Sequence, residues 1–510
     1  MWQQGIYHAA ALTARHSSRE SDYGGAGAIM DRLEDWERTG AGIQMTTAAG
    51  LPENVSAQLK ALLGERFTSD IEDRVAASCD ATKRKATPAA VVWPLSTEEV
   101  AALVAMANRH GFPLVARGAA SGLTGGAVPA PGSVVVDFTR MDRILEIDRA
   151  NLTALVEPGV IVGRLQNEVE RLGLFYPPDP ASDEFSTIGG NIAECAGGLR
   201  GLKYGVTRDY VLELEAVTGA GDVITTGSNT LKSVTGYDIT RLLVGSEGTL
   251  AIITKARLKL IPLPESLAAA VAFFSTPHAA GEAVSAMIEE RLLPRALEFI
   301  DGATMGVVGK AKGYKFPEGV NALLIIEVDG GREQVETDIR RAVEVARAKG
   351  AIEIRQARTD AEREAFWTMR KQVSPSLYSA SPDRVNEDIC VPRSRIPETL
   401  DTLADIARRH GLVVCNFAHA GDGNIHVNFL VDLSVPAQVQ AAEEAVEEVF
   451  KAAISFGGTL SGEHGIGLTK RRFLGLEVAP AEMKLMREIK RIFDPRGILN
   501  PGKLFPEERA

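Results

Sequence analysis

The stretch "HAGDGNIHVN" carries His419 and His426, seven positions apart, around a glycine-rich turn. Apolar runs flank this turn, so the sequence predicts a hairpin whose strands bring the two imidazoles near each other. Because strand side chains alternate between faces, Asn428 should share the face of His426. A second stretch, "SGEHGIG", places Glu463 beside His464 in a glycine-rich loop. The two stretches therefore concentrate groups that can bind metals and transfer protons.

Two imidazoles and one carboxylate form a three-ligand set that leaves positions open on a divalent ion, as catalytic metal sites do. A histidine pair beside a turn is equally compatible with a buried, hydrogen-bonded structural role. His464 is the candidate general base, because an imidazole titrates near neutral pH and this one neighbours the ligand set. Both interpretations stay open on these residues alone.

The composition excludes several classes of protein. The chain has 510 residues, enough for two or three domains, and its 45% hydrophobic and 24% charged residues are ordinary for a globular protein. A formal net charge of -11 disfavours nucleic acid or an anionic membrane as the main partner. Four cysteines without a CxxC pair argue against a disulfide framework, a thiolate zinc site and an iron–sulfur cluster. We expect a cytoplasmic protein with no transmembrane segment, which reaches a membrane only through a partner.

Two regions of the chain have different sequence patterns, and we expect them to form the domains that hold these motifs in place. From about residue 88 to 264, short apolar runs alternate with helices, and Ser96 precedes Glu99 by three residues, the spacing of a capping box. From about residue 266 a β-α-β order recurs, which predicts an α+β domain of split βαβ units. A helix and an extended proline-glycine segment follow near the C-terminal end.

The loop "RGAASGLTGGA" could hold an anion, because its glycines let backbone N–H groups approach a diphosphate closely. It matches neither a GxGxxG dinucleotide motif nor a P-loop, and a surface turn explains it equally well. Four further stretches rich in small residues lie between apolar runs. They are "YPPDPAS", "STIGGNIAECAGGLRGLKYG", "KSVTGYDITRLLVGSEGTLAIIT" and "DPRGILNPGKLFP".

With these stretches, the chain from about residue 55 to 506 resembles the FAD-linked dehydrogenases of the vanillyl-alcohol-oxidase-type fold. The branch it resembles contains D-lactate dehydrogenase, the glycolate oxidase D subunit and D-2-hydroxyglutarate dehydrogenase. The resemblance implies an α+β architecture: a PCMH-type FAD-binding domain, an inserted ferredoxin-like substrate (cap) domain, and a C-terminal helical return to the FAD domain. The segments expected are an N-terminal extension that is disordered (1–54), the FAD-binding domain (55–265), the cap domain with the metal hairpin (266–460), and a C-terminal segment completing the site (461–510).

The resemblance assigns FAD contacts position by position. Those implied at the diphosphate are Arg117, Gly118, Ser121, Gly122, Thr124 and Gly125. Those along the ribityl chain and flavin ring are Pro178, Ser182, Gly189, Gly190, Asn191, Ala193 and Gly197, with Gly248 and Ile253 near the adenosine half and Asn500 returning to the flavin. The "RGAAS" segment lacks the histidine that tethers FAD in covalent relatives, so non-covalent FAD is implied. Cys195 stands where relatives commonly carry asparagine, which puts one polar contact in doubt.

The resemblance also implies roles in the reaction. His419, His426 and Glu463 match the ligands of a zinc or manganese ion, and the catalytic residues expected are His464, Arg370 and Asn428. The ion would bind the substrate hydroxyl and carboxylate and lower the hydroxyl pKa. A base would take that proton while hydride passes to flavin N5.

Two positions indicate which hydroxy acid the enzyme would accept as substrate. Arg370 matches the arginine that holds the substrate carboxylate, although an arginine on a charged helix is, by itself, more simply solvent-exposed. Asn386 stands in "NEDICVP" where relatives acting on hydroxyglutarate carry a lysine. A small monocarboxylate, D-lactate or glycolate, is therefore favoured over D-2-hydroxyglutarate.

Such an enzyme needs an external electron acceptor, because the sequence has no nicotinamide motif and no fused iron–sulfur domain. A quinone, a cytochrome, an electron-transfer flavoprotein or a separate iron–sulfur subunit would serve, and a homodimer is a further expectation. Two alternatives remain: a transferase like alkyl-glycerone-phosphate synthase, and a non-catalytic flavin carrier subunit. The intact histidine motifs favour the dehydrogenase over the transferase.

Overall fold

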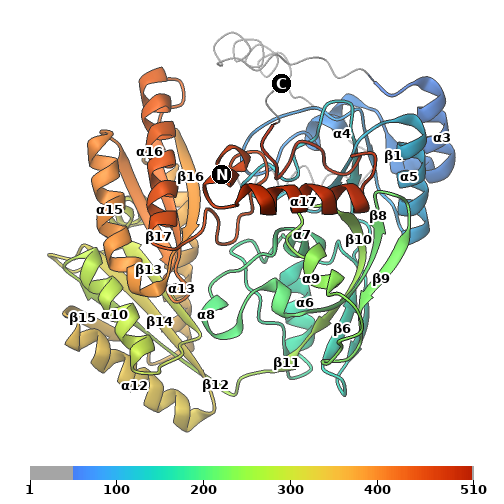
Figure 1. Cartoon of the computed structure of the whole chain (residues 1–510). Helices are drawn as coiled ribbons and strands as arrows, with labels where there is room; N and C mark the ends of the chain where they lie inside the picture. Colours follow the sequence, from blue (N-terminus) through green and yellow to red (C-terminus); the bar gives the residue numbers. More distant parts are fainter. Residues whose placement is uncertain (1–49, 508–510) are drawn as a thin grey trace, which may run out of the picture.

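The computed structural model describes residues 50–507, and Figure 1 shows two bodies of secondary structure side by side. The blue and green half precedes residue 263, the yellow and orange half follows it, and the red C-terminal segment crosses back to the first half. The extension expected at the N-terminus lies, up to residue 49, outside the described residues. Within residues 50–507, no helix combines the length and apolar character needed to cross a bilayer.

A four-stranded sheet of order β1-β2-β4-β3 opens the first half. Its elements are α3 (Glu53–Leu63), β1 (Phe67–Thr68), α4 (Ile71–Ala76), β2 (Ala90–Val92), α5 (Thr97–His110), β3 (Leu114–Arg117) and β4 (Val134–Asp137). Ser96 caps α5 by accepting the backbone N–H of Glu99 at 3.3 Å. The Glu99 carboxylate binds Arg66 and accepts the backbone N–H of Leu95 at 2.8 Å rather than that of Ser96, so only half of the predicted capping box forms.

A five-stranded antiparallel sheet of order β5-β6-β10-β8-β9 follows. Its strands and the short β7–β11 pair are β5 (Ile144–Asp148), β6 (Thr153–Val156), β7 (Leu174–Phe175), β8 (Val211–Thr218), β9 (Val223–Gly227), β10 (Ala251–Lys259) and β11 (Ile261–Pro262). The helices are α6 (Val162–Glu170), α7 (Ile188–Glu194), α8 (Gly201–Tyr204) and α9 (Ile239–Leu243). Apolar side chains of α5 share one core with β4, β8 and β10, so α5 packs between the two sheets.

The second half is built on one antiparallel sheet of seven strands, of order β15-β12-β14-β13-β17-β18-β16. The strands are β12 (Ser266–Phe274), β13 (Ala296–Asp301), β14 (Ala322–Gly330), β15 (Ala351–Gln356), β16 (Asp383–Cys390), β17 (Val413–His419) and β18 (Asn424–Val431). Between them lie α10 (Pro277–Glu289), α11 (Gly302–Lys312), α12 (Arg332–Ala348), α13 (Asp360–Lys371), α14 (Val373–Leu377), α15 (Ile396–Arg409) and α16 (Pro436–Ser455).

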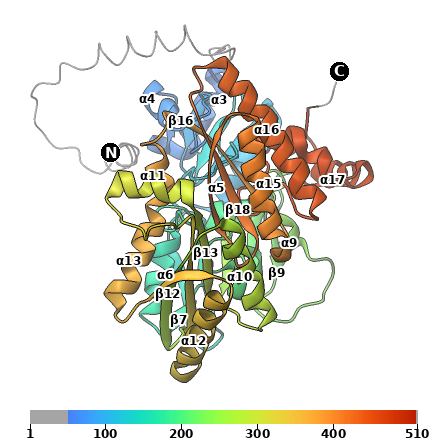
Figure 2. The same cartoon turned by 90° about the vertical axis from the view of Figure 1, so that its left-hand side faces the viewer.

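Both faces of this cap sheet are covered, which explains why β14 is almost continuously apolar. Leu324 and Ile326 belong to the core beneath α10, α12, α15 and α16, which Figure 2 shows together on one side. Leu323 and Ile325 belong to a smaller core with α11, α13 and α14. The second face also carries the polar residues of the predicted active site.

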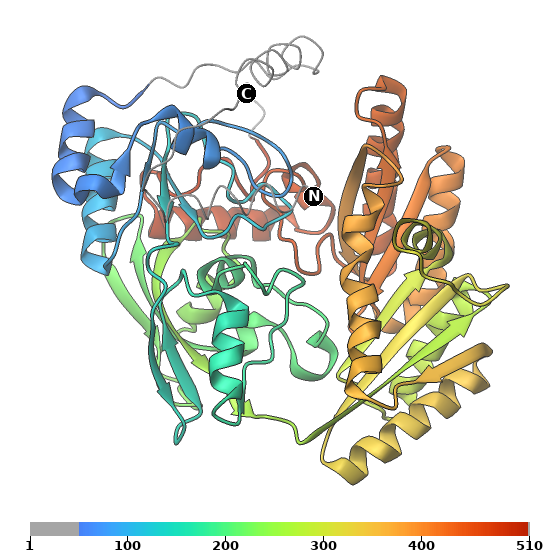
Figure 3. The ribbon, with the colours of Figure 1, turned by 180° about the vertical axis from the view of Figure 1, so that it is seen from behind.

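The C-terminal segment confirms the predicted helical return to the FAD-binding half. Helix α17 (Pro480–Phe493) ends at Asp494, whose carboxylate accepts the N–H groups of Ile498 and Leu499. Leu499 then forms a parallel bridge to Leu114 of β3. Figure 3 shows from behind how this red segment lies within the first half although it follows the cap in sequence.

Candidate active site

The β17–β18 hairpin places the two histidines of the first motif on one sheet face. The glycine-rich turn occupies residues 420–423, because Asn424 already pairs with His419. His426 pairs with Phe417, so the histidines lie diagonally across the hairpin, with ring centroids 5.0 Å apart. The sequence prediction that the two imidazoles converge is therefore confirmed.

Glu463 completes a set of three donor atoms. Its Oε1 lies 3.4 Å from Nε2 of His419 and 3.4 Å from Nε2 of His426. One donor atom from each residue lies within 4.8 Å of the other two, which fits a single divalent ion with open coordination positions. The structure thus brings together the three residues named from sequence, in an arrangement that could hold a metal ion.

The charges in the cluster shift the pKa values of the three candidate ligands in different directions. Burial alone would raise the pKa of Glu463, but His419 and His426 overcome it and hold that pKa at about 2. Burial and the neighbouring His419 lower the pKa of His426 well below its usual value. Burial opposes protonation of His419 too, yet the carboxylates of Glu298 and Glu463 raise its pKa well above normal. Glu463 is therefore ionised and His426 neutral, as metal ligands must be, whereas His419 is protonated and must release that proton to bind an ion.

Glu298 of β13 is a central residue that sequence reasoning missed. Its Oε1 lies 2.8 Å from Nδ1 of His419, and its Oε2 accepts Nε of Arg370 at 2.7 Å. The bond to Nδ1 leaves Nε2 of His419 facing Glu463, the arrangement that orients metal-binding histidines. The signal available in the sequence was an acidic residue within the largely apolar run "ALEFID", and the structure buries it completely.

Replacing Glu298 with glutamine should weaken metal binding by about 10- to 100-fold, since the amide cannot supply the charge that orients His419. Competition with a chromophoric chelator measures this directly. Glu289→Gln, at an exposed position of α10, is the matched control and should bind metal like the parent. Equal affinity in the two variants would show that the Glu298 charge does not support the site.

Arg370 of α13 is buried, with 6% of its surface exposed, which excludes the exposed alternative. Its guanidinium lies over the Phe417 ring at 4.8 Å and is fixed by the Glu298 carboxylate. Among residues 50–507, no hydrogen bond to either Nη atom is found. The two Nη groups are thus free to bind a planar anion such as a carboxylate.

Asp388 of β16 organises the "SGEHGIG" loop and was also missed from sequence. Its Oδ2 accepts the backbone N–H groups of Gly462 at 2.7 Å, Glu463 at 2.8 Å and His464 at 3.3 Å. The buried Lys470 ammonium binds the same carboxylate. The loop that carries both the third ligand and the candidate base is therefore built on one carboxylate.

His464 lies directly above the ligand set. Its ring stacks on that of His426 with centroids 5.3 Å apart, and its Nδ1 is 3.2 Å from Oδ1 of Asp388. Burial lowers the pKa of His464, against the opposing charge of Asp388. With Nδ1 turned to Asp388, Nε2 is the atom left for a substrate.

Asn428 and Asn386 face each other across β18 and β16. Asn428 is fully buried and donates Nδ2 to the carbonyl of Cys415 at 3.2 Å. Within the described chain, Oδ1 of both asparagines is buried without a hydrogen-bond partner. Two unsatisfied acceptors beside the histidines fit a site that a polar ligand completes.

The residues predicted for FAD gather around α7. This helix carries Gly189, Gly190, Asn191 and Ala193, and the glycine loop after β3 packs on its start, where a Cβ on Gly118 would collide with Thr187. At the end of the helix, Oε1 of Glu194 lies 2.6 Å from where a Cβ on Gly126 would be. In the described part of the chain, Asn191 Nδ2 and Glu194 Oε2 are buried without partners, which suits a missing polar ligand.

Two contacts connect this region to the metal loop. Thr124 Oγ1 donates to the His464 carbonyl at 3.0 Å, and a Cβ on Gly197 would lie 3.1 Å from Glu463 Oε2. Asn500 joins the glycine loop from the C-terminal segment by donating Nδ2 to the carbonyl of Gly126 at 3.0 Å. Residues that the resemblance assigns to FAD and to the metal therefore lie side by side.

For the other residues predicted to bind FAD, the structure gives less direct support. The Arg117 guanidinium donates to the carbonyl of Cys79 at 2.8 Å, so its side chain is already bound within the protein. Ile253 lies in β10 against the apolar core of its own sheet, and Gly248 approaches Asn500. The remaining members, Ser121, Gly122, Gly125, Pro178 and Ser182, lie in the loops after β3 and β7. Cys195, the departure from the family pattern, accepts Nε of Arg208 at 3.3 Å.

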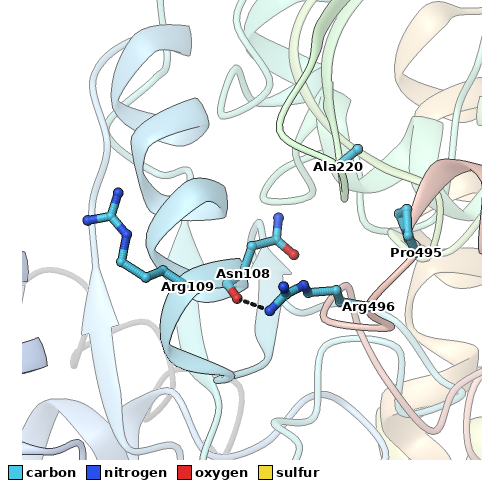
Figure 4. Close-up of a pocket in the computed structure, with 5 residues that line it drawn as sticks. All are labelled: Asn108, Arg109, Ala220, Pro495 and Arg496. Atoms are coloured by element: carbon cyan, nitrogen blue, oxygen red, sulfur yellow. Dashed lines mark hydrogen bonds between the residues drawn. The ribbon is translucent and has the colours of Figure 1, made fainter.

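A hollow of 410 Å³ at the surface lies outside these sites and is lined by Asn108, Arg109, Ala220, Pro495 and Arg496 (Figure 4). Nη1 of Arg496 donates to the Asn108 carbonyl at 2.6 Å. Figure 4 shows Arg109 pointing away from Arg496, so the two guanidinium groups do not converge on a shared ligand. None of these residues belongs to the predicted sites.

Comparison with known proteins connects both halves of the chain to flavoenzymes. A model described as "FAD binding domain" matches residues 88–227, and one described as "FAD linked oxidases, C-terminal domain" matches residues 263–504. Among solved structures, p-cresol methylhydroxylase with bound substrate superposes with a TM-score of 0.73 at 19% identity, covering 90% of this chain and 97% of the other. An alkyldihydroxyacetonephosphate synthase superposes with a TM-score of 0.69 at 22% identity, covering 91% and 88%. These likenesses confirm the predicted fold.

The sequence relatives share a higher sequence identity with this chain than these solved structures do. The glycolate oxidase subunit GlcD of Bacillus subtilis (strain 168) is 41% identical over 90% of this chain and 98% of its own. The D-lactate dehydrogenase of Anaerostipes hadrus is 37% identical over 82% and 90%, and the D-2-hydroxyglutarate dehydrogenase of Stutzerimonas stutzeri (strain A1501) is 34% identical over 82% and 91%. The chain belongs to the family of FAD-linked oxidoreductases that contains these three relatives, as its sequence motifs predict.

Proposed function

We propose that this protein oxidises a small D-2-hydroxy acid, D-lactate or glycolate, to the 2-oxo acid with bound FAD and a divalent metal. The observation that carries the proposal is the convergence of His419, His426 and Glu463 beneath the ring of His464. The names of the relatives support the substrate class, since they include a glycolate oxidase subunit and a D-lactate dehydrogenase.

The three converging ligands would hold Zn²⁺ or Mn²⁺, and the α7 region would hold FAD without a covalent bond. When bound, the metal supplies a Lewis acid that lowers the pKa of the substrate hydroxyl, and FAD supplies the hydride acceptor. Electrons would leave through an external quinone, cytochrome, electron-transfer flavoprotein or iron–sulfur subunit.

The protein's own residues bind the acid and move its proton. The Nη groups of Arg370 bind the carboxylate, and Glu298 holds that guanidinium against Phe417. His464 accepts the hydroxyl proton at Nε2, and the charge of Asp388, whose Oδ1 lies 3.2 Å from Nδ1, stabilises the imidazolium that forms.

Anaerobic mixing of the FAD- and metal-replete protein with D-lactate, L-lactate, glycolate and D-2-hydroxyglutarate tests the proposal. We expect rapid bleaching of the flavin absorbance by D-lactate or glycolate. Chelation should abolish the bleaching, and added metal should restore it. If none of the four acids reduces the flavin of fully loaded protein, the dehydrogenase is wrong and the transferase and carrier-subunit alternatives move forward.

Asn386→Lys should shift the preference toward D-2-hydroxyglutarate, because the ammonium gives a second substrate carboxylate a partner beside Asn428. The ratio of kcat/KM for D-2-hydroxyglutarate to that for D-lactate should rise by on the order of tenfold or more, as one charged hydrogen bond allows. Asn386→Met, similar in length but uncharged, is the control. A ratio that changes equally in both variants would contradict a role for charge at this position.

A further inference from the structure

Helix α8 belongs to the FAD-binding half and lies on the side of it that faces the cap half (Figure 1). It begins four residues after Gly197. Its Leu202 packs against the turn of the metal hairpin, where a Cβ on Gly421 would lie 2.7 Å from Leu202 Cδ2. A Cβ on Gly201 would in turn meet the carboxylate of Asp422 in the same turn. The segment from Gly197 to Tyr204 thus adjoins Glu463 at its start and the turn of the metal hairpin at α8.

The same helix is bound to the cap by a single buried carboxylate, that of Asp329 in β14. Tyr204 donates its hydroxyl to Oδ2 of Asp329 at 2.7 Å, and the Lys203 ammonium binds Oδ1 and also the Asp329 carbonyl, at 2.6 Å. From within the cap, Arg295 Nη1 donates to Oδ2 at 3.2 Å. The Asp329 side chain has no exposed surface, so these donors supply what water would otherwise provide.

The position of this contact matters because the two halves carry different reactants. Asp329 pairs with Leu267 near the start of β12, where the chain first enters the cap. The cap supplies His419, His426 and Arg370, whereas α7 and Gly197 belong to the FAD-binding half. The distance from a substrate on the cap to the flavin therefore depends on how the halves are held together.

We propose that Asp329 is a positioning residue: by binding Lys203 and Tyr204 it fixes α8 against the metal hairpin and so sets the separation between substrate and flavin. This inference rests on the proposed function. Hydride transfer needs its reacting atoms about 3 to 3.5 Å apart, and a displacement of about 1 Å can cost on the order of 100-fold in rate. A carboxylate that only stabilised the fold would change the amount of loaded protein and leave the rate in loaded protein unchanged.

Asp329→Asn tests this in the FAD- and metal-replete protein, with every rate normalised to bound FAD. Stopped-flow reduction by the best acid of the panel should slow on the order of 10- to 100-fold at saturating substrate, while the substrate Kd stays within about twofold. Tyr204→Phe, which removes one donor and keeps the Phe175 ring contact, should slow reduction less. Asp405→Asn, at an exposed cap position, should reduce its flavin like the parent.

Loaded Asp329→Asn that is reduced within about twofold of the parent rate would overturn the inference. If that variant does not fold, Lys203→Met and Tyr204→Phe carry the same test, and parental rates in both would overturn it equally. Failure of the proposed function is a different result, because the parent itself would then show no reduction by any of the acids.

Discussion

Replacing His464 with glutamine should slow reduction of the bound flavin by a hydroxy acid by about 10²- to 10⁴-fold, the usual contribution of a general base. Glutamine keeps the size and a polar end but has no basic nitrogen to take the hydroxyl proton. The ring it replaces stacks on His426 and is not one of the three converging ligands, so FAD and metal contents should stay near those of the parent. Stopped-flow absorbance under anaerobic conditions measures the rate.

His278→Gln is the matched control, because His278 is exposed and pairs with Asp401 on the surface of the cap. Photoreduction of the flavin in His464→Gln should proceed normally, since it needs no substrate proton. A His464→Gln protein reduced as fast as the parent would remove His464 from proton transfer. A variant that loses its metal would instead show that the ring supports the ligand set.

The candidate ligands and the candidate base could be named from sequence because they lie in two short motifs, which the family resemblance joins into one site. A glycine turn brings His419 and His426 together within one hairpin, and Glu463 precedes His464 directly. Strand alternation likewise placed Asn428 on the correct face, which the pairing of β18 confirms. Two motifs of ten residues or fewer thus contain the candidate metal ligands and the candidate general base.

Residues that act across the sheet could not be predicted in the same way. Glu298 reaches His419 only because β13 pairs with β17, and Asp388 reaches the "SGEHGIG" loop only because β16 pairs with β18. Such registers depend on how a whole sheet packs, which no local period reveals. The capping box is incomplete because the Glu99 carboxylate accepts the N–H of Leu95, one residue before Ser96, and also binds Arg66, which lies far away in sequence.

Asp388→Asn should be the most destabilising single change around the site. The carboxylate is fully buried and neutralises Lys470, whose side chain is only 1% exposed and which also donates to the Leu460 carbonyl at 2.9 Å. Removing one member of a buried charge pair costs about 3 to 5 kcal/mol, because the Lys470 ammonium loses its nearest carboxylate and keeps the more distant Glu387, at 3.8 Å. Chemical denaturation followed by circular dichroism measures the loss, and Glu447→Gln, from an exposed pair with Lys451, should cost at most about 1 kcal/mol.

The double variant Asp388→Asn/Lys470→Met separates the two roles of this carboxylate. Without the ammonium there is no uncompensated charge, so part of the stability should return, with a coupling of about 0.5 to 3 kcal/mol between the sites. Metal affinity should not return, because the N–H groups of Gly462, Glu463 and His464 still lack the anionic acceptor that places the third ligand. Recovery of stability and metal affinity together would mean that Asp388 acts only as a counter-charge for Lys470. Recovery of stability alone would assign the loop's shape, and with it the position of Glu463, to the carboxylate itself.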